Sequence, residues 1–186
     1  MSCRLPGGAD SPERLWDLVH EGRSGHVRVP ADRWNAEAFY HPDMYARDSV
    51  PFKTGHFLQN DVSAFDARFF RIPRREANGI DPQQRLVLEL TVEALENAGI
   101  PLSSVAGSDT GVYMAELARD YDRMGHKDTP NVHKLHMFGA GEALLANRVS
   151  YLMDLQGPSI TLDTGCVSLE VDSCGSEIQA DTVKVW

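Results

Sequence analysis

The stretch Gly157-Pro158-Ser159-Ile160-Thr161-Leu162-Asp163-Thr164-Gly165-Cys166 decides how this chain is interpreted. A Gly-Pro turn leads into a short β-prone run, which stops at a small residue and then a cysteine. The segment 167–171 contains no Pro or Gly and could begin a helix. A cysteine at a strand-to-helix turn lies at the positive end of a helix dipole, which favours the thiolate. The pattern therefore suggests Cys166 as a covalent nucleophile, and a buried, inert thiol is the alternative.

Length, charge and cysteine content limit the possible classes of function. The 186 residues suffice for one domain with a real core, or for part of a larger one. The net charge of −9 disfavours nucleic acid and anionic membrane surfaces as partners. No apolar run reaches membrane-spanning length, and the first residues do not form a signal peptide. Three distant cysteines do not make a disulfide framework, so we expect a reducing, cytoplasmic location.

Helix signals alternate with short apolar strands along the chain. Residues 10–22 are predicted to form a helix that Asp10 or Ser11 caps, and residues 23–60 a loop with short elements. The clearest helix is 81–98, with Asp81 at its N-cap and Gln84 where a capping box has Glu or Gln. A strand is predicted at 109–115 and a further helix at 141–155. This alternation predicts an α/β fold with a covered sheet.

The stretch 116–138 is polar and contains His126, His133 and His136. No acidic or cysteine ligands stand at a recognised spacing from these histidines, so we expect a solvated surface segment and no metal site. The nearby Gly139-Ala140-Gly141 is too short a match to indicate dinucleotide binding.

Short motifs follow one another in a fixed order between about residue 3 and Cys166. They are Cys3-Arg4-Leu5-Pro6-Gly7-Gly8, Leu15-Trp16, Pro30-Ala31-Asp32-Arg33-Trp34, Phe65-Asp66-Ala67-Arg68-Phe69-Phe70, Arg75-Glu76-Ala77, Asp81-Pro82-Gln83-Gln84-Arg85, Glu93-Ala94-Leu95-Glu96-Asn97-Ala98-Gly99, Asn147-Arg148-Val149-Ser150-Tyr151 and Gly157-Pro158-Ser159. This ordered set resembles the N-terminal part of the ketosynthase (β-ketoacyl synthase) domain of type I polyketide synthases, most like those of fungi.

The resemblance implies an α/β fold that is an incomplete thiolase-like fold, the N-terminal half of a layered α/β/α/β/α arrangement that usually forms a homodimer. The implied reaction is a decarboxylative Claisen condensation, catalysed by an acyltransferase of the β-ketoacyl synthase type. The implied partners are an acyl carrier protein domain and acyl and malonyl thioesters. No cofactor is expected on this chain itself, because the acyl groups arrive on the phosphopantetheine of the carrier protein.

By the same resemblance, Asp163-Thr164-Gly165-Cys166 is similar to the Asp-Thr-Ala-Cys active-site motif of the family, with Gly at the Ala position. Cys166 is then the acyl-accepting catalytic nucleophile, and its backbone N–H points into the oxyanion hole. The two catalytic histidines of the family follow the cysteine in sequence. Here all seven histidines precede it: His20, His26, His41, His56, His126, His133 and His136.

After Cys166 the resemblance fails. We therefore predict a partial ketosynthase N-terminal domain at 1–166 and a divergent tail at 167–186, in which Cys174 is incidental. We expect a truncated ketosynthase, arising from a gene-model artefact, a retained intron or a degenerate gene. Such a chain could carry an acyl group on Cys166 but not complete the condensation alone. The alternatives are a non-catalytic fragment that associates with a full-length synthase, and a free-standing cysteine hydrolase with a histidine partner from 126–136.

Overall fold

The computed structural model describes residues 1–127, 134–163 and 182–183. Its contacts divide the chain into two compact units. One unit is Cys3–Asp61, and the other combines Met1–Ser2 with Val62–Trp186. None of the described helices combines the length and the apolar character that crossing a bilayer requires.

The Cys3–Asp61 unit contains short elements joined by loops, as predicted for residues 23–60. In chain order these are α1 (Pro12–His20), β1 (His26–Arg28), α2 (Ala36–Phe39) and β2 (Thr54–His56). The strands β1 and β2 form an antiparallel pair with His26 opposite His56.

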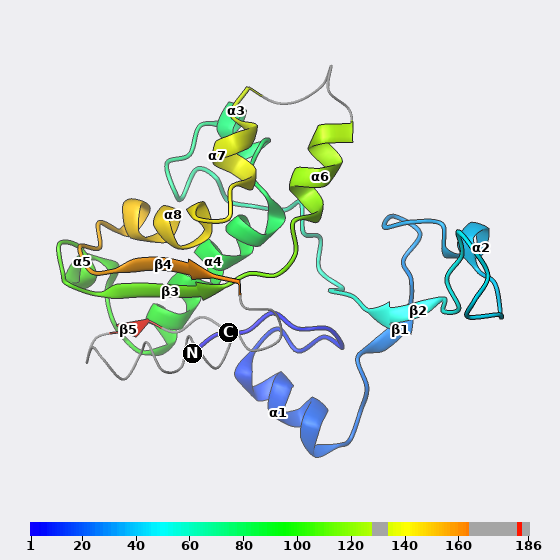
Figure 1. Ribbon diagram of the computed structural model, residues 1–186. Coiled ribbons are helices and arrows are strands. Elements are labelled where there is room, and N and C mark those ends of the chain that lie inside the picture. Colours follow the sequence, from blue (N-terminus) through cyan, green and yellow to red (C-terminus); the bar gives the residue numbers. More distant parts are fainter. Residues whose placement is uncertain (128–133, 164–181, 184–186) are drawn as a thin grey trace. The chain divides into compact units, whose positions relative to one another are not determined.

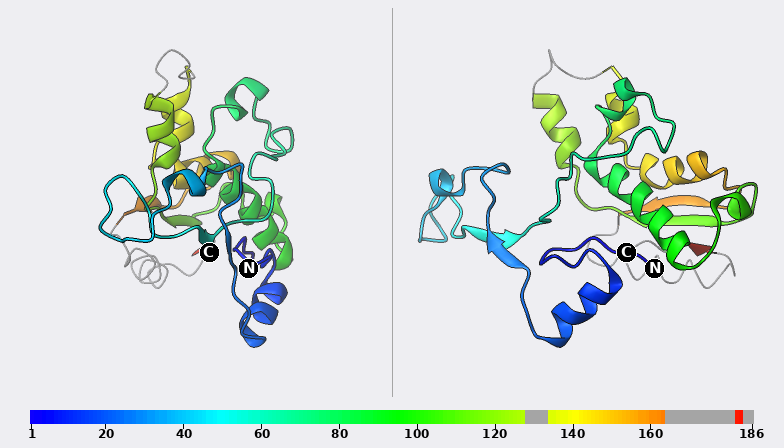
Figure 2. Two further views of the ribbon diagram at one scale, coloured as in Figure 1. Left: turned by 90° about the vertical axis from the view of Figure 1, so that its right-hand side faces the viewer. Right: turned by 180° about the vertical axis from the view of Figure 1, so that it is seen from behind.

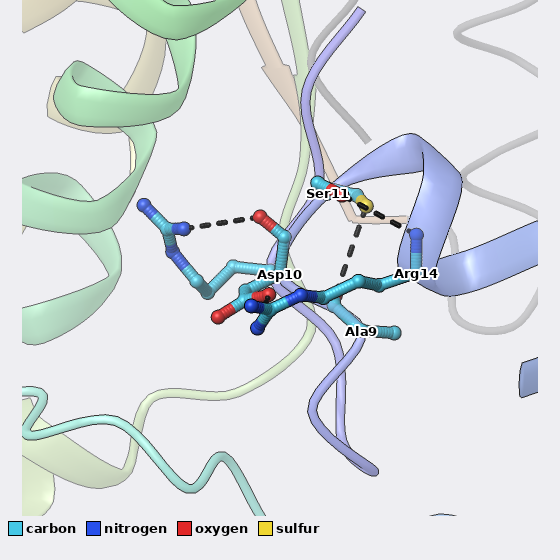
Figure 3. Close-up of polar contacts among 6 residues, drawn as sticks. Ala9, Asp10, Ser11 and Arg14 are labelled. Carbon is cyan, nitrogen blue, oxygen red and sulfur yellow. Dashed lines mark hydrogen bonds and ion pairs between the residues drawn. The ribbon is translucent and has the colours of Figure 1, made fainter. Parts of the chain in front are cut away.

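Helix α1 begins where the sequence predicts it. The Oγ atom of Ser11 accepts a hydrogen bond from the backbone N–H of Arg14 at 3.3 Å, and Pro12 is the first helical residue (Figure 3). The guanidinium of Arg14 reaches back to the Asp10 carboxylate at 2.7 Å. In the preceding turn Gly7 and Gly8 have φ values of 85° and 75°, a conformation that favours glycine.

The larger unit contains a parallel sheet with helices packed on it (Figure 1). Its elements are α3 (Arg74–Ala77), α4 (Pro82–Asn97), α5 (Leu102–Val105), β3 (Gly111–Ala115), α6 (Asp120–Lys127), α7 (His136–Ala140), α8 (Leu144–Met153), β4 (Ser159–Leu162) and β5 (Thr182–Val183). The strand order is β4-β3-β5, and both pairings are parallel. Helix α8 packs along β3 and β4, and α4 packs against α8.

Helix α4 supplies much of the core. The predicted N-cap is confirmed, because Asp81 accepts a hydrogen bond from Gln83 N–H at 2.8 Å. The apolar stripe is centred on Leu88, Val92 and Leu95, which join a buried cluster with residues of β3 and α8.

Gln84 does not complete a capping box. Its side chain turns away from the helix start and binds Arg148 of α8, whose Nε donates to Gln84 Oε1 at 2.8 Å. Arg148 also donates to the Glu76 carboxylate and to the backbone oxygen of Phe138, each at 2.7 Å. This one guanidinium, on a side chain that is 9% exposed, therefore joins α3, α4 and α7 to α8.

The described part of the stretch 116–138 contains the helix α6 and the start of α7, and it has no buried residue, in agreement with the predicted surface segment. Acidic residues stand in the first turn of α6 and basic residues in its last turn, an arrangement that complements the helix dipole. Further along α7, a Cβ atom on Gly139 would lie 1.7 Å from the backbone oxygen of Gly79. This close approach explains why the first residue of Gly139-Ala140-Gly141 is a glycine.

The Arg148 contacts lead to a prediction about stability. Replacing Arg148 with Met leaves the Glu76 carboxylate and the Phe138 carbonyl without their partner. The free energy of unfolding should therefore fall by about 3 kcal/mol, measured by urea denaturation. Arg119→Met is the matched control in the same unit, because it breaks the half-exposed ion pair with Glu142. This control should cost less than about 1 kcal/mol. Equal losses in the two variants would contradict the structural role of Arg148.

Candidate active site

The strand β4 delivers the chain to the predicted nucleophile motif. It pairs with β3 in parallel from Val112 opposite Ser159 to Ala115 opposite Leu162. Glu116, the residue that follows β3, donates a hydrogen bond from its backbone N–H to Leu162 O at 3.0 Å. The two strands therefore end at the same level, and ligands of parallel sheets bind at this carboxyl edge.

Cys166 itself lies outside the described residues, as do Thr164, Gly165, His133 and Cys174. The last described residue before the cysteine is Asp163, which directly follows β4.

The Gly-Pro-Ser turn fixes the start of β4. A Cβ atom on Gly157 would lie 2.3 Å from Asp109 O and 2.5 Å from Thr110 O, so only glycine allows this close approach. Val112 N–H donates to Pro158 O at 2.7 Å. The side chains of β4 also contact α8, because Ser159 Oγ donates to Asn147 Oδ1 at 2.8 Å. The turn and α8 together set the position at which the motif begins.

Glu116 is the titratable group that sequence reasoning missed at this edge. The pKa of Glu116 is raised to about 7, chiefly by burial and also by the nearby Asp81 and Asp163 carboxylates, while Arg119 opposes the shift. Burial also raises the pKa of Asp81. A carboxyl group with a pKa near neutrality can give or take a proton under physiological conditions. The available signal was an acidic residue placed directly after a buried strand.

The described histidines of 116–138 lie together on α6 and α7. His126 and His136 both approach the carboxylate of Asp122. From the sequence alone, no metal ligands are expected in this stretch. The Asp122–His126 spacing of four residues on a helix was the signal that could have indicated the cluster.

The raised pKa of Glu116 predicts how stability depends on pH. The folded state keeps the Glu116 proton up to about pH 7, whereas the unfolded chain releases it near 4.5. The stabilisation from this group is therefore present below pH 4.5 and is lost as the pH rises towards 7. Glu116→Gln should flatten the fall in unfolding free energy over this window, measured by urea denaturation at several pH values. Glu96→Gln, which removes an exposed carboxylate of α4, should leave the shape of the curve unchanged. A fall of the same size in Glu116→Gln would mean that other groups cause it.

Comparison with known proteins identifies relatives along nearly the whole chain. Residues 1–171 match the model of the β-ketoacyl synthase N-terminal domain. The chain is 57% identical over 169 residues to a highly reducing polyketide synthase of Sordaria araneosa, covering 89% of this chain and 5% of that protein. It is 54% identical over 167 residues to a highly reducing polyketide synthase of Stachybotrys chartarum, covering 89% of this chain and 7% of that protein. The chain thus spans about a twentieth of the length of these relatives.

Solved structures with the same arrangement are ketosynthases. The oxazolomycin ketosynthase domain of Streptomyces albus matches with a TM-score of 0.80 and 36% identity, over 94% of this chain and 30% of that one. The ketosynthase from module 6 of the bacillaene synthase of Bacillus subtilis matches with a TM-score of 0.80 and 29% identity, over 94% of this chain and 28% of that one. The predicted fold class is confirmed: the chain has the N-terminal part of the α/β thiolase-like fold. It belongs to the β-ketoacyl synthase family, as an N-terminal ketosynthase segment of the polyketide synthase type.

Proposed function

We propose that this chain provides the acyl-accepting part of a polyketide synthase ketosynthase, with Cys166 as the nucleophile. In this step the Cys166 thiolate attacks the carbonyl carbon of an acyl thioester. The carbon–sulfur bond to the carrier breaks as the new thioester forms, and the released carrier thiolate takes up a proton. The observation that carries the proposal is the parallel strand β4, which ends level with β3 and leads directly into Asp163-Thr164-Gly165-Cys166.

We further propose that the 186-residue chain stops at the acyl-cysteine stage. Family ketosynthases use histidines that follow the cysteine for decarboxylation and condensation, and residues 167–186 contain no histidine. Catalytic groups that act as a unit lose most of their effect when one is missing. The thiol can be acylated without the histidines, whereas carbon–carbon bond formation needs the whole set.

The proposed donor is an acyl group on the phosphopantetheine of a carrier protein domain, and the proposed assembly is the homodimer usual for the family. Glu116 is a candidate positioning residue for the segment that follows β4, because its backbone binds the end of that strand.

Incubation with a soluble acyl thioester tests the nucleophile. Intact-mass measurement should find one acyl group per chain, and peptide mapping should locate it on Cys166. The adduct should be absent from Cys166→Ala and present in Cys174→Ala and Cys3→Ala, the other two cysteine variants. Circular dichroism of each variant checks that it is folded. Addition of malonyl-carrier protein to the acylated chain should give no β-ketoacyl product.

Two results would contradict parts of this proposal. An adduct that survives Cys166→Ala, or that maps to Cys174, would remove Cys166 as the nucleophile. Formation of a β-ketoacyl product would show that the chain completes condensation without histidines after the cysteine.

A further inference from the structure

Three potential metal ligands meet between α6 and α7, away from the cysteine motif in sequence. Asp122 and His126 lie one turn apart on α6, and His136 is the first residue of α7. The two helices pack side by side (Figure 2). His136 Nε2 lies 3.0 Å from Asp122 Oδ1, and His126 Nδ1 lies 3.4 Å from the same oxygen. The three candidate ligand atoms all lie within 4.8 Å of one another.

The separations of 3.0 and 3.4 Å from Asp122 Oδ1 are close to those within a zinc coordination shell. Bonds of 2.0–2.1 Å in a tetrahedron place neighbouring ligand atoms about 3.3 Å apart. Two imidazoles and one carboxylate are also a donor set that Zn²⁺ accepts, with a water in the fourth position. Mg²⁺ and Ca²⁺ prefer oxygen ligands, so two imidazoles disfavour both ions.

Gly125 makes the approach of His136 possible. A Cβ atom at this position would lie 2.3 Å from His136 Cε1 and 2.8 Å from its Nε2. Glycine inside a helix costs about 0.5–1 kcal/mol relative to alanine. The residue therefore weakens α6 locally but leaves room for the imidazole against the helix backbone.

The three ligands differ in exposure in a way that suits an ion bound from solvent. The side chain of His136 is only 12% exposed, and Tyr121 stacks on its ring at a centroid distance of 6.3 Å. Asp122 and His126 are 38% and 68% exposed. One imidazole is thus held in place, while the other two ligands border the solvent from which the ion and its water enter.

We propose that Asp122, His126 and His136 bind one Zn²⁺ ion, which ties α6 to α7. His126 Nδ1 also lies 2.9 Å from Asp122 O, a hydrogen bond that needs the proton on Nδ1. Coordination through Nδ1 therefore breaks this hydrogen bond and uses the tautomer that carries the proton on Nε2. Binding to the folded state alone stabilises this pair of helices by mass action.

Zinc affinity of the metal-free 186-residue chain, measured by competition with a chromophoric chelator, tests the site. We expect one ion per chain and no competition from Mg²⁺. Loss of an outer-shell partner already weakens metal binding by about 10–100-fold, so loss of a ligand in His136→Ala or Asp122→Asn should weaken it at least as much. His20→Ala, which removes an exposed histidine of α1 in the other unit, should bind zinc like the unchanged chain.

Gly125→Ala is the sharper variant, because it keeps all three ligands and favours the helix. It should preserve the far-ultraviolet circular dichroism and still weaken zinc binding by at least about tenfold. Substitution by Co²⁺ should give visible d–d bands of a tetrahedral site without the near-ultraviolet bands of thiolate ligands.

The proposal is overturned by an absence of stoichiometric binding, by thiolate bands with Co²⁺, or by equal affinity in Gly125→Ala. If His136→Ala fails to fold, Gly125→Ala and the cobalt spectrum still decide the question.

Discussion

The largely buried guanidinium of Arg148 makes the interaction on which the larger unit depends. Its donors reach α3 through Glu76, α4 through Gln84 and α7 through Phe138 O. A planar guanidinium can hold three acceptors in fixed directions, which an ammonium cannot do. Asn147, the residue before Arg148 in α8, accepts a hydrogen bond from the Ser159 hydroxyl of β4. Adjacent residues of one helix thus orient both the surrounding helices and the strand that leads to the cysteine motif.

Elements with strong local signals could be predicted from the sequence. The Asp81 cap and the predicted range 81–98 placed α4 within one residue at each end, and the Gly157-Pro158 turn placed the start of β4. Contacts that depend on tertiary structure could not be predicted in this way. Gln84 stands at a capping-box position but binds Arg148 instead, because the buried charge offers it a stronger partner. Glu116 similarly acquires its raised pKa only when folding buries it near Asp81.

The polar stretch 116–138 shows a second limit of sequence patterns. Its composition is typical of a solvated segment, and α6 has no buried residue. Helix α6 nevertheless forms, with charges that suit its dipole, and it packs against α7. The position of His136 against Gly125 depends on a contact between residues eleven positions apart on different helices. No helical or strand periodicity encodes such a contact, although a glycine inside a charged helix is a local sign that something approaches closely.

Several motif residues that identify the family have roles in packing. Glu76 and Gln84 each accept a hydrogen bond from Arg148, Asn147 positions Ser159, and Gly157 allows close backbone contact. None of these groups needs to touch a substrate to explain its place. The described part of the fold therefore draws on a polar network centred on Arg148. The proposed chemistry rests on different residues, at the carboxyl edge of β3 and β4 and beyond it. A chain can for this reason match the family closely over its packing residues while its capacity for condensation depends on groups outside that network.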